Sequence, residues 1–186
     1  MKSWGRLGMN YNSYQLQEVC SFIDYRGKTP PKTSHGIPLI TAKIVKGGKI
    51  LPPTEFIADE YYDEWMRRGI PRKGAVLFTT EAPLGEVAQI TTDEKLAFAQ
   101  RIIILQADES RLCNDYLLYA LQHGTLRNRI LSKATGTTVT GIKAADLKTV
   151  VIDLPSLSVQ KRIASICKSL DSKIAINEKI NDNLAA

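Results

Sequence analysis

The chain has 186 residues, of which 44% are apolar, and it carries a formal net charge of +6. This length and apolar content are enough for one domain with a hydrophobic core of its own. The sequence contains no apolar run of about 18 residues, as a membrane-spanning helix needs, and residues 1–10 lack the apolar centre of a signal peptide. We therefore expect no membrane segment and a cytoplasmic location.

The three cysteines, Cys20, Cys113 and Cys167, are odd in number and lie far apart in the sequence. They form no Cys-x-x-Cys pair, which argues against both a disulfide framework and a zinc site. We expect them to be reduced thiols in the core.

Basic residues gather in three stretches that contain no Asp or Glu, namely residues 25–54, 65–80 and 116–145. Folding can bring these stretches together as one positive face suited to a polyanion, although a solvated surface is the plainer alternative. The basic residues that we expect to contact DNA from these stretches are Arg26, Lys28, Lys43, Arg67, Arg68 and Lys143.

The first part of the chain is rich in loops. Residues 13–23 show weak alternation of apolar and polar side chains, and residues 24–31, with a glycine and two prolines, predict an extended polar loop. Residues 36–42 predict a strand. Residues 43–53 predict another loop, with two consecutive glycines as a turn.

The middle of the chain predicts a short helix followed by strands. Residues 59–68 begin with acidic and end with basic side chains, as the helix dipole favours. Strands are predicted at residues 75–79, 86–90 and 101–106, with a polar bend at residues 79–85. The third strand is the most hydrophobic, so we expect it to be central in the sheet.

Residues 115–131 predict a second helix with Gly124 as a weak point. The polar, glycine-rich residues 134–143 predict a loop, followed by a helical turn at 144–147 and a strand at 150–154. Strands alternate only irregularly with helices, which indicates the α+β class with a mixed or mostly antiparallel sheet.

The last segment predicts one long helix of the coiled-coil type, about 40 Å in length. Pro155 ends the strand before it, and Ser158 is a good N-cap. Its apolar stripe consists of Ile163, Ile166, Leu170, Ile174, Ile180 and Leu184, interrupted by Asn177. A polar residue on such a stripe fixes register in helix pairs.

This stripe predicts pairing with a second helix, and packing back on the core of its own domain is the alternative. No stop signal follows Leu184, which favours pairing. We accordingly divide the chain into a recognition domain at residues 1–156 and a spacer or dimerisation helix at residues 157–186.

Catalytic motifs are missing from the sequence. The two histidines, His35 and His123, have no metal-binding spacing, and no nucleotide-binding or nucleophile motif occurs. Acidic residues near lysines, such as Asp171 beside Lys173, have the local shape of a nuclease site, but a solvent-exposed helix face explains them better. We expect no catalytic residues, no metal and no cofactor.

The loops instead offer hydrogen-bonding side chains suited to base edges and phosphates. Turn or capping roles are the alternative for each residue taken singly. The candidates for contacting DNA are Thr79, Thr80, Glu81, Gln100, Arg101, Thr137, Thr138, Thr140 and Lys143.

Several segments in this order are familiar: Asp24-Tyr-Arg-Gly-Lys-Thr-Pro-Pro, Phe78-Thr-Thr-Glu-Ala-Pro-Leu-Gly, Ala99-Gln-Arg, Thr135-Gly-Thr-Thr-Val-Thr-Gly-Ile-Lys and Leu154-Pro-Ser-Leu-Ser-Val-Gln-Lys-Arg-Ile-Ala. Together they resemble the DNA specificity subunit of type I restriction-modification enzymes over nearly the whole chain. The resemblance implies a non-catalytic subunit that recognises double-stranded DNA. Its implied partners are methylation subunits, which use S-adenosylmethionine, and an ATP-driven restriction subunit.

In that family, two recognition domains each read half of a split site, and long helices separate them. This sequence carries one domain and one helix, which implies either a shortened form or a natural half-subunit. A half-subunit would pair with a second copy through its helix and read a palindromic site. The resemblance places DNA contacts at the 79–85 bend and the 135–143 loop, and methylation subunits at residues 160–163.

Two other functions remain open from the sequence. The chain could be a non-catalytic interaction fragment that pairs through its helix with another specificity subunit. An independent nuclease that depends on Asp171 is the less favoured possibility.

Overall fold

Helices and strands are interleaved throughout the computed structural model, which describes residues 10–25 and 29–184. The elements in chain order are β1 (Asn12–Gln15), α1 (Leu16–Val19), β2 (Cys20–Asp24), β3 (Ile37–Ile40), β4 (Val45–Lys46), β5 (Lys49–Ile50), β6 (Phe56–Ile57), η1 (Asp59–Tyr61), α2 (Tyr62–Trp65), η2 (Met66–Arg68), β7 (Val76–Thr79), β8 (Val87–Gln89), β9 (Ala97–Phe98), β10 (Ile102–Ala107), α3 (Asn114–Gln122), α4 (Gly124–Ser132), α5 (Ala144–Lys148), β11 (Val151–Leu154) and α6 (Leu157–Leu184). The predicted α+β class and the long final helix are confirmed.

The central sheet has the antiparallel strand order β2-β10-β7-β8, so β10 lies inside it, as its apolar sequence predicted. Side chains of β10 alternate between two cores. Ile102 and Ile104 face one core, whereas Ile103 and Leu105 face the other. Because both faces are covered, the strand is a continuous apolar run rather than an alternating one.

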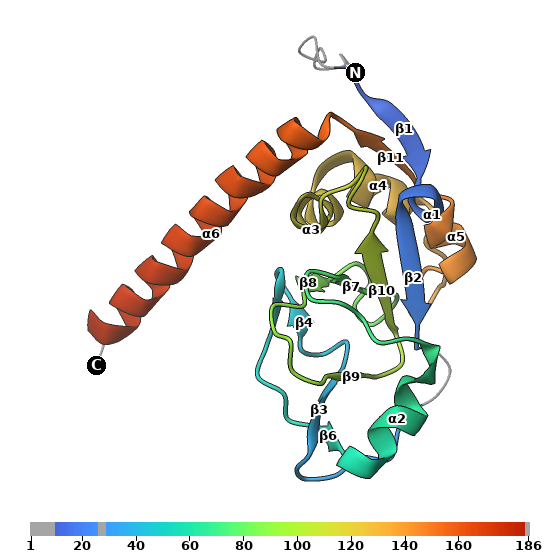
Figure 1. Cartoon of the computed structure of the whole chain (residues 1–186), viewed down its shortest axis with the longest axis vertical. Coiled ribbons are helices and arrows are strands. Elements are labelled where there is room, and N and C mark those ends of the chain that lie inside the picture. The colour runs from blue at the N-terminus through green and yellow to red at the C-terminus, as the bar shows by residue number, and fades with distance from the viewer. Residues whose placement is uncertain (1–9, 26–28, 185–186) are drawn as a thin grey trace.

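The two cores lie on opposite sides of this sheet (Figure 1). On one side, helices α1, α3, α4 and α5 cover it, and Phe78, Leu117 and Ile130 are buried there. On the other side lie α2 and a small sheet of order β6-β3-β9, with Leu39 and Phe98 in the core. In that small sheet, β3 and β9 are parallel, which makes the strand directions mixed overall.

The prediction of a single helix at residues 115–131 is wrong, because the structure forms two helices there. His123 ends α3 and directly precedes α4. Gly124 has a φ of +72°, a left-handed conformation that glycine adopts at little cost and that no helix interior uses. The glycine identified as a weak point is therefore the position at which the chain changes direction.

The predicted loop at residues 43–53 contains a short hairpin instead, with β4 paired to β5. Its turn is the predicted one: Gly47 and Gly48 both have positive φ, which is typical of tight hairpin turns. Among the described residues, all three cysteines are free. Only Cys20 is buried in the core, where burial and then the charge of Asp108 raise its pKa to about 12.

Helix α6 begins at Leu157, one residue before the predicted cap Ser158. Its first turns pack on α3, with Gln160 and Ala164 buried, and its remainder extends away from the other elements (Figure 1). The stripe side chains Ile166, Leu170 and Ile174 are each more than half exposed. No helix in the described part of the chain is long and apolar enough to cross a membrane.

Candidate nucleic-acid interface

The bend after β7 is stabilised by the two threonines that we expected to contact DNA. The Thr79 hydroxyl donates to the Pro83 carbonyl at 2.6 Å and accepts the Glu86 N–H at 2.9 Å. Thr80 is 3% exposed, and its hydroxyl lies 3.3 Å from the Arg101 carbonyl. Because both hydroxyls are buried and bonded internally, we remove Thr79 and Thr80 from the candidate contacts.

The bend lies against the 135–143 loop. The backbone N–H of Ile142 donates to the Thr80 carbonyl at 3.0 Å, and Glu81 forms an isolated β-bridge with Gly141. Thr135 and Gly141 exchange two backbone hydrogen bonds of 2.9 Å, which close the loop at its base. Two segments that are far apart in the sequence therefore form one surface.

Arg101 completes this surface at the start of β10. Its carbonyl accepts the Thr80 N–H at 2.9 Å, so its backbone is fixed beside the bend. Its side-chain Nε lies 3.0 Å from Oε1 of Glu81, and the two side chains are 46% and 42% exposed. Arg101 has a φ of +75°, a left-handed conformation that is unfavourable for a residue with a Cβ atom.

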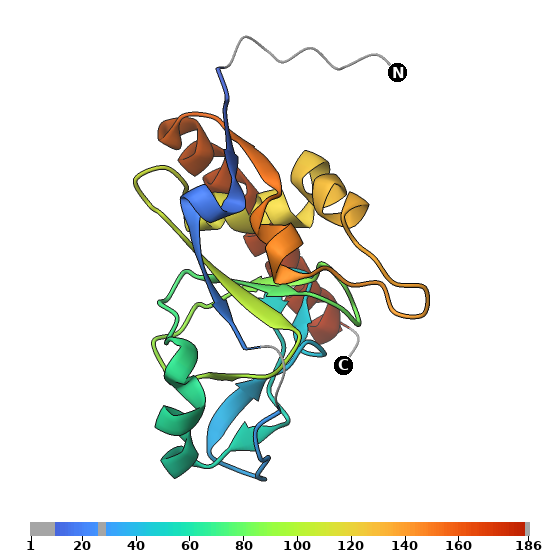
Figure 2. The same ribbon diagram turned by 90° about the vertical axis from the view of Figure 1, so that its right-hand side faces the viewer.

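An open cavity of about 420 Å³ lies between these segments. It is lined by five of the predicted contacts, Thr80, Glu81, Gln100, Arg101 and Lys143, which come from three separate parts of the chain. Thr80 is the buried one of the five. The predicted Thr137, Thr138 and Thr140 are exposed on the loop between α4 and α5, which projects from the body in orange in Figure 2.

The chemistry of this surface suits nucleic acid. Arg and Gln side chains form paired hydrogen bonds with guanine and adenine edges, carboxylates accept from the cytosine amino group, and lysines neutralise phosphates. Val139, which sequence reasoning missed, lines the same cavity and is 51% exposed. An apolar side chain among threonines was the available signal, since such groups contact the thymine methyl.

The other predicted basic residues have varied surroundings. Arg68 donates to the carbonyl of Asp24, which pairs with Ile103 near the Arg101 end of β10. Arg67 lies 3.5 Å from Glu64 on an exposed surface, and Lys43 is exposed in the turn after β3 without lining the cavity. The predicted contacts Arg26 and Lys28 lie outside the described residues.

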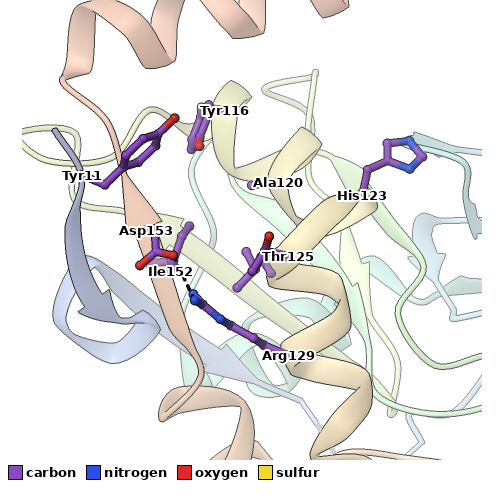
Figure 3. A pocket seen from close by; sticks show the side chains of 9 residues that line it. Tyr11, Tyr116, Ala120, His123, Thr125, Arg129, Ile152 and Asp153 are labelled. Atoms are coloured by element: carbon purple, nitrogen blue, oxygen red, sulfur yellow. Dashed lines mark hydrogen bonds and ion pairs between the residues drawn. The ribbon is translucent and has the colours of Figure 1, made fainter. Parts of the chain in front are cut away.

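A second pocket, of about 340 Å³, lies beside α3, α4 and β11 (Figure 3). Arg129 extends from α4 to Asp153, with 2.9 Å between Nη2 and Oδ2, and it also donates to the Val151 carbonyl at 2.8 Å. Ser13 donates to the same carboxylate at 2.6 Å. These charged groups hold β1, β11 and α4 together.

The nuclease candidate Asp171 has a structural contact, since it accepts the Tyr119 hydroxyl at 2.7 Å. In the ranges that the structure describes, no group of three or more His, Cys, Asp or Glu residues is placed to hold a metal ion. His123 lies at the junction of α3 and α4.

The fold and this surface define an α+β domain that presents polar loops at one end of its sheet and a long projecting helix. The chain belongs to the type I restriction modification DNA specificity domain family, whose profile matches residues 9–186.

Two curated relatives are specificity subunits from Methanocaldococcus jannaschii. The putative type I restriction enzyme MjaX specificity subunit is 24% identical over 97% of this chain and 41% of its own length. The type I restriction enzyme MjaIX specificity subunit is 30% identical over 60% of this chain and 25% of its own length. The chain therefore spans less than half the length of these relatives.

Solved structures share the fold. One is a structure on complex assembly and conformational transition of the type I restriction-modification system. It has a TM-score of 0.67 at 24% identity, and the match covers 95% of this chain and 42% of the other chain. The HsdS subunit from Thermoanaerobacter tengcongensis has a TM-score of 0.63 at 23% identity, with 94% and 41% covered. The S subunit from M. genitalium has a TM-score of 0.59 at 20% identity, with 96% and 45% covered.

Proposed function

We propose that this chain is a non-catalytic recognition subunit that reads one half of a split site in double-stranded DNA. In this proposal it directs methylation subunits and a restriction subunit to that site. The family match over residues 9–186 and the names of the curated relatives support this reading.

The observation that carries the proposal is the convergence of Gln100, Arg101, Glu81 and Lys143 around one open cavity. Glu81 aligns Arg101 through the 3.0 Å ion pair, and Gln100 precedes Arg101 in the same turn. We assign base reading to this turn. Lys143 and the loop residues Thr137, Thr138 and Thr140 are assigned to phosphates and neighbouring bases.

The backbone of Arg101 supports a functional role. A left-handed conformation costs a residue with a Cβ atom roughly 1–2 kcal/mol, whereas an exposed ion pair typically contributes about 0.2–1 kcal/mol. The pair with Glu81 therefore does not offset the unfavourable backbone. Such conformations concentrate at functional sites, which supports selection of Arg101 for what its side chain binds.

For the helix, we propose pairing with the α6 of a second copy. At about 100° per residue, the stripe of Ile163, Ile166, Leu170 and Ile174 lies about 100° around α6 from the face that contacts α3. The stripe is thus separate from the docked face. Leu170 and Ile174 also line an open groove of about 680 Å³ beside α3, together with polar and charged residues such as Glu86 and Arg127. Asn177 would set the register of the pair.

Selection of duplexes from a random DNA library by the purified chain tests recognition. We expect enrichment of a short sequence by the native chain. Arg101→Ala should lose the base preference at one position of that sequence, and Lys143→Ala should retain the whole sequence at lower affinity. A phosphate contact by Lys143 also predicts that its loss reduces the salt-dependence slope by about one. Binding of all duplexes alike would contradict sequence reading. Stable pairing with an intact specificity subunit, without any DNA selectivity, would favour the interaction-fragment alternative.

A further inference from the structure

Gln160 is a fully buried polar side chain at the junction between the two parts of the chain. Its Oε1 accepts the Cys113 N–H at 2.9 Å, and its Nε2 donates to the carbonyls of Arg111 and Pro155, each at 2.9 Å. The partners are all backbone atoms. The amide therefore ties the start of α6 to the segment that leads into α3. Burial also excludes Gln160 from the predicted contact with methylation subunits.

Three further contacts extend this attachment along α6. Ala164, one turn after Gln160, is 3% exposed. Lys168 Nζ lies 2.6 Å from Oδ2 of Asp115 at the start of α3, and the Tyr119 hydroxyl donates to Asp171. Asp115 in turn accepts a hydrogen bond from Gln89 of β8, which links the attachment to the central sheet.

The buried amide of Gln160 and the two outer contacts differ in how well they fix the angle between α6 and the recognition domain. Lys168 is half exposed, and its flexible side chain keeps its ion pair over a range of helix tilts. The three hydrogen bonds of Gln160 are directional and shielded from water, and any one of them broken leaves a buried polar group unsatisfied. Gln160 therefore fixes the point about which α6 can tilt relative to the recognition domain.

The part of α6 beyond Gln160 is long. From Gln160 to Leu184 the helix rises about 36 Å at about 1.5 Å per residue. A tilt of about 5° displaces its far end by about 3 Å, close to the rise of one base pair of about 3.4 Å. A small change at Gln160 thus moves a paired recognition domain by a whole base-pair step.

We propose that Gln160 is a positioning residue that fixes the angle between the recognition domain and the spacer helix, and thereby the distance between two half-sites. The fixed angle follows from the contacts of Gln160, whereas the distance between half-sites rests on the proposed function.

The angle is tested by measuring the distance between two spin labels, one in the recognition domain and one on α6. The labels are introduced as encoded amino acids at the exposed positions Glu94 and Glu178. The labelled chain is diluted with unlabelled chain, so that only distances within one chain are measured. The chain with native Gln160 should give one narrow distance distribution. Gln160→Leu should broaden and shift it, and Gln160→Glu, which retains the acceptor for Cys113, should do so to a smaller extent. Lys161→Ala, at an exposed neighbouring position, is the control and should match the native chain. Unchanged distributions in both Gln160 variants would overturn the proposal.

The consequence for DNA is tested with duplexes whose two half-sites are separated by spacers differing by single base pairs. The native chain should prefer one spacer length, and in Gln160→Leu that preference should fall toward a ratio of one while affinity for a single half-site is unchanged. Spacer preference unaffected by Gln160→Leu would overturn the positioning role. Absence of half-site binding by the native chain would instead contradict the proposed function, and the distance measurement would still decide the angle.

Discussion

Glu81 and Arg101 form an ion pair across the mouth of the candidate interface, with 3.0 Å between Oε1 and Nε. Glu81 lies in the bend after β7, and Arg101 immediately precedes β10, so the pair joins the ends of two adjacent strands. Nε faces Glu81, and in our proposal the terminal nitrogens of the guanidinium contact DNA. The ion pair thus orients a half-exposed arginine without any bound partner.

Replacement of Arg101 is predicted to reduce DNA affinity without reducing the stability of the fold. Arg101→Gly removes the side chain and relieves the left-handed backbone at φ +75°, so we expect thermal stability within about 0.5 kcal/mol of the native chain or slightly higher. DNA affinity should fall by about 1–3 kcal/mol, with loss of base preference at one position. Arg111→Ala, at an exposed arginine beyond the opposite end of β10, is the matched control for charge. Equal losses for the two variants would contradict a specific role for Arg101.

The 135–143 loop is predicted to depend on Gly136. A Cβ atom at this position would collide with the Val139 carbonyl oxygen, and its φ of +120° is unfavourable for other residues. Gly136→Ala should therefore distort the loop and reduce DNA affinity about tenfold or more, while the Tm changes little because the loop is exposed. Gly47→Ala is the control for backbone strain alone, since Gly47 also has a positive φ, of +57°, but nothing lies within 4 Å of its added Cβ. Native affinity in Gly136→Ala would show that the loop does not contact DNA.

Pairing through α6 is predicted to depend on its apolar stripe. Leu170 is 54% exposed, so Leu170→Asp should leave the fold of one chain intact and abolish dimers in sedimentation equilibrium. Burial of two symmetry-related leucines is worth on the order of 3 kcal/mol, which corresponds to more than a hundredfold in Kd. Ser165→Asp, on the opposite side of α6, should not change association. A native chain that stays monomeric at high concentration would contradict pairing.

Attachment of α6 to α3 is predicted to weaken in acid. Burial raises the pKa of Asp115, but hydrogen bonds from Lys168 and Gln89 and the charge of Lys168 outweigh it, so the pKa of Asp115 lies below its usual value. A lowered native pKa stabilises the fold above the unfolded pKa and loses that effect as pH falls through the native value. Because the pair is partly exposed, the contribution is about 0.5–1 kcal/mol.

Asp115→Asn should therefore destabilise the chain at neutral pH by that amount, and the difference from the native chain should vanish as the pH falls through the lowered native pKa of Asp115. Chemical denaturation at several pH values measures it. Asp93→Asn, which removes a surface partner of Lys73, is the control and should have no measurable effect. A difference that persists unchanged to low pH would assign the effect to packing rather than charge.

Sequence patterns predicted the elements better than the environment of single side chains. The apolar run at β10 predicted a central strand, and the stripe of α6 predicted a long helix, although the sequence left open whether that stripe is exposed for pairing or packed on its own core. Thr79 and Thr80 looked like loop hydroxyls because sequence shows residue type but not burial. Their bonds to the Glu86 backbone and the Arg101 carbonyl depend on segments brought together only by folding.

Other features had no local signal. Gln160 lies between Val159 and Lys161 in a polar segment, and its buried role depends on the segment before α3, which is far away in sequence. The left-handed backbone of Arg101 was equally hidden, because this conformation usually marks glycine. Gly124 did carry a signal, but a lone glycine within a helical pattern is usually tolerated, so its φ could not be predicted.

We propose that this chain reads half of a split DNA site and acts as a pair. The most direct test of this proposal is to combine the chain with the methylation subunits of its own system and S-adenosylmethionine, and to map methylated adenines on sequence-diverse DNA. We expect methylation within two inverted copies of one short sequence at a fixed separation. Methylation at an asymmetric site, or methylation without sequence preference by an assembled complex, would contradict it.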